Sequence, residues 1–572
     1  MTIDILGIHD GHNAAAAFLR DGRVLGAVQE ERFTRAKNQG DFPRRCVEWL
    51  LGSARPESLT VALNGKYINP GQWTREAVIA SYGSSGGSLE RLKQPFKRTW
   101  IDSRYQESKA RRREQTIRDG GLGSFQTVPV EHHLAHASAA YYGSGWMEGK
   151  VLVLTCDGSG DRLSGSVNIG NEGRLERIAE IDENDSIGRV YATVTYFMGM
   201  VPLEHEYKIM GLAPYTGDAS RAEQESRIFS ELFEFDPRNP MVWRRRHGVP
   251  PIYAASAYLE QRLRHRRFDY VAAGLQKFVE DILTRWVRNC VKETGISRIA
   301  CSGGVFMNVK ANQAILALPE VDELFVYPTC GDESNAIGAA YWTYAQSLLE
   351  EGQLLALSGT APLYLGPAFS DDDVEATLRQ AELKGIRHSH LEDVERRAAE
   401  ALAAGKVVAR AKGPMEFGAR ALGNRSILAR PDNPNVVRII NEMIKCRDFW
   451  MPFAPSVLEE RAADYYVKPK PMPAPHMIIT FDSRPDRRDR FPAAQHPYDF
   501  TTRPNEVSAT SNPDYYRLLK HYESITGEGI VLNTSFNIHG EPIAMTPEDC
   551  LSVFRRSGLE CMVLGNFWLQ KE

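Results

Sequence analysis

Residues 3–12 read IDILGIHDGH, an apolar run that passes directly into an acidic loop with glycine. Residues 151–161, VLVLTCDGSGD, repeat the same pattern later in the chain. A short apolar run that is bounded by turn residues is typical of a buried strand. After the first loop, residues 14–19, the turn Asp21-Gly22 and residues 24–28 predict a β-hairpin of two further strands.

A third junction of this kind lies at residues 299–304, where an apolar strand enters a pair of glycines. Residues 271–293 and 336–350 place apolar side chains near the helical period, and a short strand at 325–327 ends at an acidic loop. Two strand-to-acidic-loop openings and one glycine-rich turn are the layout of an actin-like ATPase, the duplicated RNase H-like (ASKHA) fold. We therefore expect an α/β domain over residues 1–358, with nucleotide bound in a cleft between two related halves.

The chain changes character after this domain. Residues 352–367 are rich in leucine, glycine and proline, which predicts a break. Beyond the break, helices and strands alternate, and we expect a second α/β domain over residues 359–572, a normal size for one domain. The expected elements of this domain are at 391–404, 407–410, 515–525, 529–532 and 546–556. Residues 80–125, rich in glycine and serine and then in charge, predict an irregular or helical insertion in the first domain.

The composition is that of a globular protein. Of the 572 residues, 42% are hydrophobic and 25% are charged, and the net charge is −4. This balance gives no global attraction to nucleic acid or to an anionic membrane, so we expect neither as a partner. The basic runs at residues 111–113 and 244–246 are expected to be solvated faces.

The cysteines and the N-terminal sequence indicate a cytoplasmic protein. Eight cysteines occur without a C-x-x-C pair, a pattern that suits a reducing compartment and argues against a zinc ribbon. The first residues, MTIDILGIHDG, do not combine a basic segment with a long apolar one, so no signal peptide is expected. No uninterrupted run of ~18 apolar residues predicts a membrane-spanning helix. We therefore expect a soluble protein.

Two histidines one helical turn apart form the first candidate site. His132 and His136 lie in EHHLAHASAA, at the start of an alanine-rich helix, and therefore share one face. Such a pair can chelate a metal ion, or it can be two half-buried histidines at a helix start. Asp157 and Asp332, each in a glycine-bounded loop after a strand, would complete a donor set that favours Fe²⁺, Zn²⁺ or Mn²⁺ over Ca²⁺. His133 points elsewhere on the helix and is not expected to be a ligand.

The glycine loops are candidates for phosphate binding. Gly158, Gly303 and Gly304 follow strands, where a missing Cβ lets backbone N–H groups approach a phosphate. Asn308, on the first turn after these glycines, could contact adenosine or phosphate. A tight turn explains each loop alone equally well, but two loops near acidic residues favour a nucleotide cleft.

The first acidic loop offers a candidate general base. His12 could take a proton from an attacking hydroxyl, and the neighbouring carboxylate of Asp10 could orient the imidazole. The alternative is that Asp10 only caps the turn and that His12 faces solvent. The residues alone do not favour either interpretation, and His9 is expected to be structural.

The second domain concentrates side chains that bind anions. They lie in short polar loops between apolar strands, which favours a site for a small phosphorylated substrate over surface ion pairing. The candidates are Arg420, Lys445, Arg447, Arg503, Asn533 and Ser535. The neighbouring Phe449, Trp450, Met451 and Phe453 are expected to pack in the core.

Motifs along nearly the whole chain, in order, resemble the NodU/CmcH family of O-carbamoyltransferases. The matching stretches are HNAAAAFLRDG, QEERFTRAK, EHHLAHASAA, EYKIMGLAPY, CSGGVFMNVK, GDESNAIGAA, MEFGARALGNRSILA, KCRDFWMPFAPSV and LNTSFNIHGEPI. The longer stretches are highly specific. The resemblance implies an actin-like N-terminal domain, like that of the tRNA threonylcarbamoyl transferases, and a YrdC-like C-terminal domain.

The resemblance also implies an activity. The YrdC-like site would use ATP to convert carbamoyl phosphate into carbamoyladenylate, and the N-terminal site would pass the carbamoyl group to an acceptor hydroxyl. The family metal is typically iron, and it would be held by the two histidines and two aspartates named above. Mg²⁺ would accompany ATP. The nucleotide contacts would include Lys208, Gly303, Gly304 and Asn308. The carbamoyl phosphate site would take the six candidates of the second domain.

One position departs from the family pattern. The family often has an aspartate directly after the histidine of the first loop, whereas this chain has Asn13 after His12. Asp10 is therefore the better candidate to orient His12.

The acceptor cannot be identified from these motifs. We expect a hydroxyl of a sugar or macrocyclic natural product such as an antibiotic, chosen by residues 65–125 and 240–270, and we expect a homodimer. Carbamoylation of a protein thiol would suit C-x-x-C zinc motifs, and a tRNA target would suit a basic stripe, neither of which occurs. A non-catalytic actin-like ATP sensor is the other alternative, which the combination of His12 and the predicted metal ligands disfavours.

Overall fold

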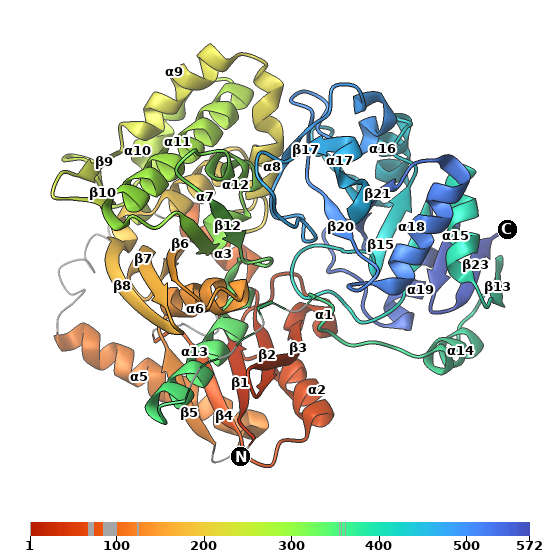
Figure 1. The fold of residues 1–572 in the computed structure, drawn as a ribbon, viewed down its shortest axis with the longest axis horizontal. Helices are drawn as coiled ribbons and strands as arrows, with labels where there is room; N and C mark the ends of the chain where they lie inside the picture. Colours follow the sequence, from red (N-terminus) through yellow and green to blue (C-terminus); the bar gives the residue numbers. More distant parts are fainter. Residues whose placement is uncertain are drawn as a thin grey trace. The chain divides into compact units, whose positions relative to one another are not determined.

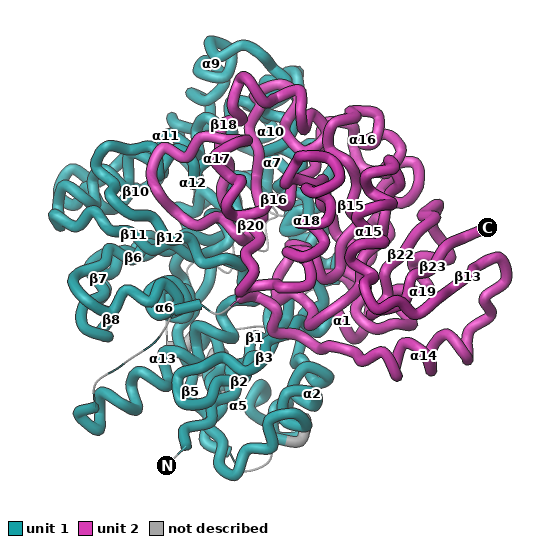
Figure 2. The backbone as a smooth tube through the Cα atoms, turned by 45° about the vertical axis from the view of Figure 1, so that its right-hand side comes forward, with its two compact units in different colours: residues 1–31, 38–361 teal, residues 32–37, 362–572 magenta. Residues whose placement is uncertain are grey.

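The chain forms two compact units. A computed structural model describes residues 2–66, 74–83, 100–122, 125–353, 355, 357, 359, 360 and 362–572. Unit 1 comprises Met1–Glu31 and Asn38–Ala361, and unit 2 comprises Arg32–Lys37 and Pro362–Glu572 (Figure 2). The short segment Arg32–Lys37 therefore packs with the C-terminal unit. A single domain boundary at residue 358, as expected from the sequence, places this segment in the N-terminal domain.

The first sheet of unit 1 contains the predicted hairpin. Its strands are β1 (Asp4–His9), β2 (Ala15–Arg20), β3 (Arg23–Gln29), β4 (Thr60–Asn64) and β5 (Gln126–Val130). They lie in the order β3-β2-β1-β4-β5 (Figure 1). The pairs β1–β2 and β2–β3 are antiparallel, whereas β1–β4 and β4–β5 are parallel. The turn at Asp21-Gly22 joins β2 and β3 as predicted.

The second sheet of unit 1 repeats this arrangement. Its strands are β6 (Lys150–Gly160), β7 (Leu163–Asn171), β8 (Arg174–Asp182), β11 (Arg298–Ser302) and β12 (Glu323–Val326). They lie in the order β12-β11-β6-β7-β8, with β6–β7 and β7–β8 antiparallel and β6–β11 and β11–β12 parallel. Both sheets therefore have the same strand order and the same directions, as a duplicated fold requires.

One strand differs from its prediction. The sequence predicts a loop from Cys156 to Asp161, but β6 continues through Gly160. Its pairing with β7 shifts register between Cys156 and Gly160, so this stretch is a bulged strand. A bulge leaves residues outside the regular ladder and redirects their side chains. Asp157 lies in this bulged stretch.

Two helices pack closely on the strands of unit 1. They are α6 (His132–Ser144) and α13 (Asn335–Glu350). A Cβ added to Gly338 would lie 2.0 Å from the carbonyl oxygen of Ala135, and one added to Gly7 would lie 1.8 Å from that of Ala336. The glycine- and alanine-rich sequence of these elements therefore allows the backbones to approach.

The other helices of unit 1 surround the two sheets. They are α2 (Arg44–Ala54), α3 (Arg75–Gly83), α5 (Trp100–Ile117), α7 (Ile187–Phe197), α8 (Glu206–Leu212), α9 (Ala219–Ser230), α10 (Ser256–Leu263), α11 (Phe268–Thr294) and α12 (Val309–Leu316). A two-stranded sheet consists of β9 (Phe233–Asp236) and β10 (Asn239–Arg245). The insertion predicted at residues 80–125 is helical where it is described, and residues 84–99, 123 and 124 lie outside the described residues.

Unit 2 is built on an eight-stranded sheet. Its strands are β13 (Ile386–His390), β14 (Val408–Ala411), β15 (Arg425–Ala429), β16 (Ala454–Leu458), β20 (Asn505–Val507), β21 (Ile530–Ser535), β22 (Cys561–Leu564) and β23 (Phe567–Lys571). Their order is β13-β23-β22-β14-β15-β21-β16-β20. A smaller sheet contains β17 (Tyr466–Val467), β18 (Phe481–Ser483) and β19 (Thr501–Thr502). Unit 2 is thus an α/β unit, as predicted.

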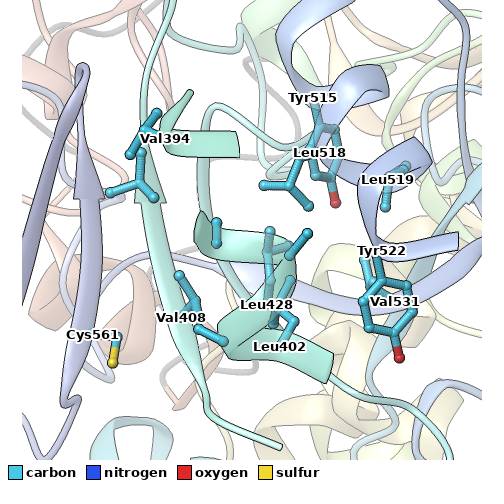
Figure 3. Packing of buried hydrophobic residues seen from close by; sticks show 14 of the residues in the cluster. Val394, Leu402, Val408, Leu428, Tyr515, Leu518, Leu519, Tyr522, Val531 and Cys561 are labelled. Carbon is cyan, nitrogen blue, oxygen red and sulfur yellow. The ribbon is translucent and has the colours of Figure 1, made fainter. Parts of the chain in front are cut away.

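The helices that pack against this sheet include α15 (Val394–Ala403), α18 (Pro513–Thr526) and α19 (Pro547–Arg556). The unit also contains α14 (Asp371–Gln380), α16 (Asn435–Ile440) and α17 (Ala462–Tyr465). Leu518 and Leu519 of α18 pack with Leu402 of α15 and with Leu428 and Val531 of the sheet (Figure 3). Within the described residues, no helix has the length and apolar character needed to cross a membrane.

We expect the substitution Leu518→Ala to destabilise unit 2 strongly, because Leu518 is fully buried and the truncation leaves a cavity. Cavity-forming substitutions of this kind cost about 2–5 kcal/mol. Ile525→Ala on the same helix is the matched control, because Ile525 is 51% exposed. The measurement is the opening free energy of amides in β14, β15 and β21 by hydrogen exchange. Equal effects of the two substitutions would contradict the packing described.

Candidate functional site

Four side chains from three segments of unit 1 come together. His132 and His136 lie in the first turns of α6, Asp157 lies in the bulged part of β6, and Asp332 begins a 3₁₀ turn after β12. One ligand atom from each lies within 4.8 Å of the others. The Nε2 atom of His132 is 3.2 Å from Asp157 Oδ2 and 3.5 Å from Asp332 Oδ1. The Nε2 atom of His136 is 3.4 Å from Asp332 Oδ1.

The start of α6 is fixed by a cap. Glu131 precedes the helix, and its carboxylate accepts hydrogen bonds from the backbone N–H groups of His133 and Leu134, at 2.9 and 2.8 Å. Arg177 of β8 forms an ion pair with the same carboxylate. Because the cap determines where the helix begins, it also determines that His132 and His136 occupy the first turns.

Glycines allow the backbone to approach this group. A Cβ on Gly160 would lie 2.1 Å from the ring of His132, and one on Gly303, where φ is +109°, would lie 2.3 Å from the carbonyl oxygen of Cys156. The backbone N–H of Gly304 donates to Asp157 Oδ1 at 2.9 Å. Close packing therefore explains Gly303 and Gly304, and the N–H of Gly304 is directed at a carboxylate.

Neighbouring polar groups orient the imidazoles. His136 Nδ1 lies 3.2 Å from the hydroxyl of Ser302, and its Nε2 lies 3.1 Å from the amide nitrogen of Asn335. His133 is buried, and its Nδ1 lies 2.8 Å from the hydroxyl of Thr155. It lies outside the group of four, in agreement with the expectation that it is not a ligand.

The electrostatics of the group favour a positive charge at its centre. Burial lowers the pKa of His132, but the carboxylates of Asp332 and Asp157 outweigh burial and raise that pKa to about 10. Burial raises the pKa of Asp157, but the imidazoles of His132 and His136 outweigh burial and lower it. A buried and a half-buried carboxylate this close together are stabilised by positive charge, carried either by an imidazolium or by a bound cation.

The donor set fits a divalent metal ion. Asp332 Oδ1 is buried and accepts no hydrogen bond, although it faces both Nε2 atoms. Two imidazole nitrogens and two carboxylate oxygens are typical ligands of Fe²⁺, Mn²⁺ or Zn²⁺. The hydroxyl of Ser302, at Nδ1 of His136, is an outer partner of the kind that orients a ligand imidazole.

The loop after β1 adjoins this group. His9 Nε2 lies 3.9 Å from Asp332 Oδ2. His9 Nδ1 lies 2.7 Å from the side-chain amide nitrogen of Asn64, which can only donate, so Nε2–H donates to the carbonyl oxygen of His12 at 2.9 Å. Burial lowers the pKa of His9 to about 4, so the ring is neutral. His9 thus holds the backbone of the loop, as expected for a structural residue.

His12 is a half-buried histidine in this loop. Burial lowers the pKa of His12, and the nearby carboxylates of Asp332 and Glu31 offset burial only in part. The ring is therefore neutral near pH 7, the form that can accept a proton. The next residue, Asn13, has a φ of +64°, a left-handed conformation that asparagine tolerates better than most residues.

The carboxylate of Asp10 binds an arginine that the sequence analysis does not name as its partner. Both of its oxygens accept from the guanidinium of Arg113, with Nε to Oδ2 and Nη2 to Oδ1 each 2.7 Å apart. Arg113 also donates to the carbonyl oxygens of Gly65 and Asn64. Asp10 therefore forms a buried ion pair with α5, and its role in orienting His12 stays a prediction.

This ion pair also corrects the expectation for the basic run at residues 111–113. Arg113 is only 4% exposed, whereas Arg111 and Arg112 are exposed. The local sequence does not distinguish the three arginines, because the partner carboxylate lies more than a hundred positions away. Arg113 is thus a residue of the candidate site that sequence reasoning missed.

The other predicted nucleotide contacts lie elsewhere in unit 1. Asn308 caps α12, with its Oδ1 accepting from the N–H of Ala311 at 3.0 Å, and its amide nitrogen donates to Gln276. The fold therefore already uses its amide. Lys208 lies half-buried in α8. Gly158 has open space where a Cβ would be, so a ligand could approach its backbone.

Unit 2 brings together four of the predicted cations. Burial lowers the pKa of Arg503, and the charges of Arg420 and Arg447 lower it further. Burial also lowers the pKa of Lys445, as do the charges of Arg447 and Lys37. Cations that lower one another's pKa in this way are close in space and would be stabilised by an anion. We name Arg420, Lys445, Arg447 and Arg503 the cationic cluster.

Lys445 is anchored by the loop after β21. Its ammonium, only 2% exposed, donates to Asn537 Oδ1 at 2.7 Å and to the hydroxyl of Ser535 at 3.2 Å. Ser535 is therefore adjacent to the cationic cluster. Asn533 lies in the interior of the sheet, where its amide nitrogen donates to the carbonyl oxygen of Ala421 and to Ser456. Its position supports the sheet.

The aromatic residues after Lys445 are not all in the core. Met451 and Phe453 are buried, with Arg447 stacked over Phe453, but Phe449 is 73% exposed and corrects the expectation. Lys37 also lies near Lys445, but it is not among the residues predicted for the anion site. Its place at the end of the family-like stretch QEERFTRAK is the sequence signal that could have identified it.

We expect the substitution Arg113→Met to destabilise unit 1, because it leaves the buried carboxylate of Asp10 without a counter-ion. Breaking a buried ion pair on one side costs about 3–5 kcal/mol. The measurement is the opening free energy of amides in β1 and β4 by hydrogen exchange. The exposed neighbour Arg112→Met is the control, and Asp10→Asn combined with Arg113→Met should recover part of the loss. No difference between the two arginine variants would refute the ion pair.

Two family models cover most of the chain. Residues 4–341 match the model described as carbamoyltransferase N-terminus, and residues 399–571 match the model described as carbamoyltransferase C-terminus. The matched ranges contain the four grouped residues of unit 1 and the whole cationic cluster of unit 2.

Full-length relatives agree with these matches. The protein sll1178 of Synechocystis sp. is 31% identical, over 98% of this chain and 95% of its own length. MJ1051 of Methanocaldococcus jannaschii is 30% identical over 99% of both chains. The nodulation protein NolNO of Sinorhizobium fredii is 32% identical over 98% of this chain and 79% of its own.

Solved structures are more distant. Full-length HypF in its phosphate- and nucleotide-bound form aligns with 61% of this chain and 56% of its own, at 14% identity and a TM-score of 0.33.

Proposed function

The chain belongs to the carbamoyltransferase family, and from that premise we propose that it is an ATP-dependent O-carbamoyltransferase. Unit 2, as a YrdC-like domain, binds carbamoyl phosphate, which water converts to carbamate and free phosphate. The carbamate oxygen then bonds to the α-phosphate of ATP, pyrophosphate leaves, and carbamoyladenylate forms. Unit 1, as an actin-like domain, transfers the carbamoyl group to an acceptor hydroxyl. The observation that carries the proposal is the family match over both halves of the chain.

The cationic cluster supports the first step. Carbamoyl phosphate carries its charge on the phosphate, and guanidinium groups bind phosphate through two parallel hydrogen bonds. Arg420, Arg447 and Arg503 would bind the phosphate oxygens. Burial lowers the pKa values of Arg503 and Lys445, and neighbouring cations lower them further, so an anion bound among these groups would be stabilised.

The loop of His12 supports the second step. In the transfer, the acceptor oxygen bonds to the carbamoyl carbon, the bond from that carbon to the adenylate oxygen breaks, and AMP leaves. The neutral imidazole of His12 takes the hydroxyl proton, and its lowered pKa keeps it in the accepting form. His9 and Asn64 hold the backbone of the loop and so position the base.

The grouped residues of unit 1 support a metal-dependent transfer. His132, His136, Asp157 and Asp332 would hold a divalent cation, with iron the choice that the family resemblance implies. When bound there, the metal would supply Lewis-acid stabilisation of negative charge on the nucleotide phosphate. Gly158, with its open backbone, and Lys208 would contact the nucleotide, and Mg²⁺ would accompany ATP.

The proposed acceptor is a hydroxyl of a sugar or macrocyclic natural product. Residues 240–270, which contain most of β10 and all of α10, and the described parts of 65–125 would select it. We propose a cytoplasmic enzyme without nucleic-acid or membrane partners, in keeping with its net charge of −4.

The experiment is a product assay on the full chain with ATP, carbamoyl phosphate, Fe²⁺ and a panel of glycosylated and macrocyclic hydroxyl compounds. Mass spectrometry should detect a product that is heavier by one carbamoyl group and that requires both small substrates. The substitution His12→Gln should lower this turnover by about 10²–10⁴-fold, the range typical of a lost general base. It should leave carbamoyl-phosphate-dependent pyrophosphate release intact.

The matched control is His388→Gln, because His388 is exposed on the edge strand β13. Equal turnover of the His12 variant and the wild type would remove His12 from the mechanism. The absence of any carbamoyl-phosphate-dependent turnover from folded, metal-loaded protein would refute the proposed function and favour a sensor.

A further inference from the structure

The segment Arg32–Lys37 belongs to unit 2, although both its neighbours along the chain belong to unit 1 (Figure 2). Its side chains contact the rest of unit 2. Phe33 packs against Met415, Ile543 and Met545. These three residues come from two separate stretches of unit 2. One stretch, residues 413–424, carries Arg420 of the cationic cluster, and the other, residues 536–545, follows the anchor of Lys445.

Arg35 holds the second of these stretches. Its Nη1 donates to the carbonyl oxygen of Ile543 at 2.6 Å and its Nη2 to that of Pro542 at 2.7 Å. Its Nε lies 3.6 Å from the carboxylate of Asp549, at the start of α19. Asn537, at the other end of the stretch, accepts from Lys445 and donates to the carbonyl oxygen of Glu541 at 2.7 Å. The carbonyl groups that Arg35 binds are thus next to the residues that place Lys445.

Arg32 holds the first stretch. It is 3% exposed, and its Nη2 donates to the carbonyl oxygen of Gly418 at 2.7 Å, two positions before Arg420. From within the stretch, Glu416 accepts from the backbone N–H groups of Leu422 and Asn424, each at 2.8 Å. The backbone on either side of Arg420 is therefore fixed by a carboxylate within the stretch and by a guanidinium from residue 32.

The hydrogen bonds from Arg32 and Arg35 act against the mutual repulsion of the cations in the cationic cluster. Four cations in partly buried positions repel one another, and the loops that carry them separate unless other contacts hold the backbone. Hydrogen bonds from a charged guanidinium to carbonyl oxygens are stronger than neutral ones, and Arg35 makes two of them in parallel. The segment also brings a fifth cation, Lys37, close enough to lower the pKa of Lys445.

We propose that Arg32 and Arg35 are positioning residues for the cationic cluster. They fix the two loops that carry Arg420 and the acceptors of Lys445, so that an N-terminal segment of the chain completes the anion-binding site of unit 2. This inference rests on the proposed function, in which that cluster binds carbamoyl phosphate. Neither arginine touches the substrate; both act through the loops.

The test measures carbamoyl-phosphate-dependent pyrophosphate release by the full chain, which needs no acceptor. For Arg35→Met we expect the KM for carbamoyl phosphate to rise by about 10-fold or more, as when a charge-assisted hydrogen bond is lost. The kcat at saturating carbamoyl phosphate should stay within about twofold, because no reacting group changes. The KM of Arg35→Lys for carbamoyl phosphate should lie between the values of the wild type and of Arg35→Met, because one ammonium cannot donate to both carbonyl groups as the guanidinium does.

Two further variants make every outcome decisive. Arg44→Met, at an exposed position in α2, is the matched control and should keep the wild-type KM. Arg503→Met tests the cluster itself and should raise the KM at least as much as Arg35→Met. A raised KM for Arg503→Met with an unchanged KM for Arg35→Met and Arg32→Met would overturn this inference alone, even if their melting temperatures fall. An unchanged KM for Arg503→Met would overturn the proposed site and, with it, the positioning role.

Discussion

A buried and a half-buried carboxylate beside two buried imidazoles impose the constraint on which unit 1 depends. Asp157 and Asp332 approach the rings of His132 and His136 to within 3.2–3.5 Å, a geometry that needs positive charge to be stable. The surrounding structure allows this approach. The bulge in β6 places Asp157 outside the regular strand pairing, and glycines stand at positions where a Cβ atom would clash. The duplicated sheet order brings β6, β11 and β12 side by side, so the segments that follow these strands can meet.

Unit 2 instead concentrates partly buried cations, and its proposed ligand, carbamoyl phosphate, is an anion. The proposed ligand of unit 1 is a metal ion, which the two carboxylates would bind. The loops around the cationic cluster are held by hydrogen bonds to backbone carbonyl groups from Arg32 and Arg35. Backbone anchoring of this kind keeps cations together while their charges remain available to a substrate.

The sequence predicts structural features that depend on local pattern. It does not predict features that depend on contacts between residues far apart in the chain. Apolar runs such as 151–155 identify the strands, and the spacing of His132 and His136 identifies one face of a helix. The bulge in β6 was missed because glycine and aspartate after an apolar run indicate a loop equally well. Arg113 was missed because its partner, Asp10, is far along the chain, and nothing local separates it from the exposed Arg112. Nor does local pattern reveal that residues 32–37 pack with the C-terminal unit.

The most direct test of this account is the metal stoichiometry of the full chain. Chelator-treated protein would be dialysed against Fe²⁺, Mn²⁺ or Zn²⁺, and the bound metal would be measured by elemental analysis. The account predicts one ion per chain, with affinity reduced by about 10-fold or more in Asp332→Asn, because a neutral amide is a weaker ligand than a carboxylate. Asp489→Asn, at an exposed position in unit 2, should bind as the wild type does. Wild-type affinity in Asp332→Asn, or no stoichiometric binding by the folded chain, would contradict the account.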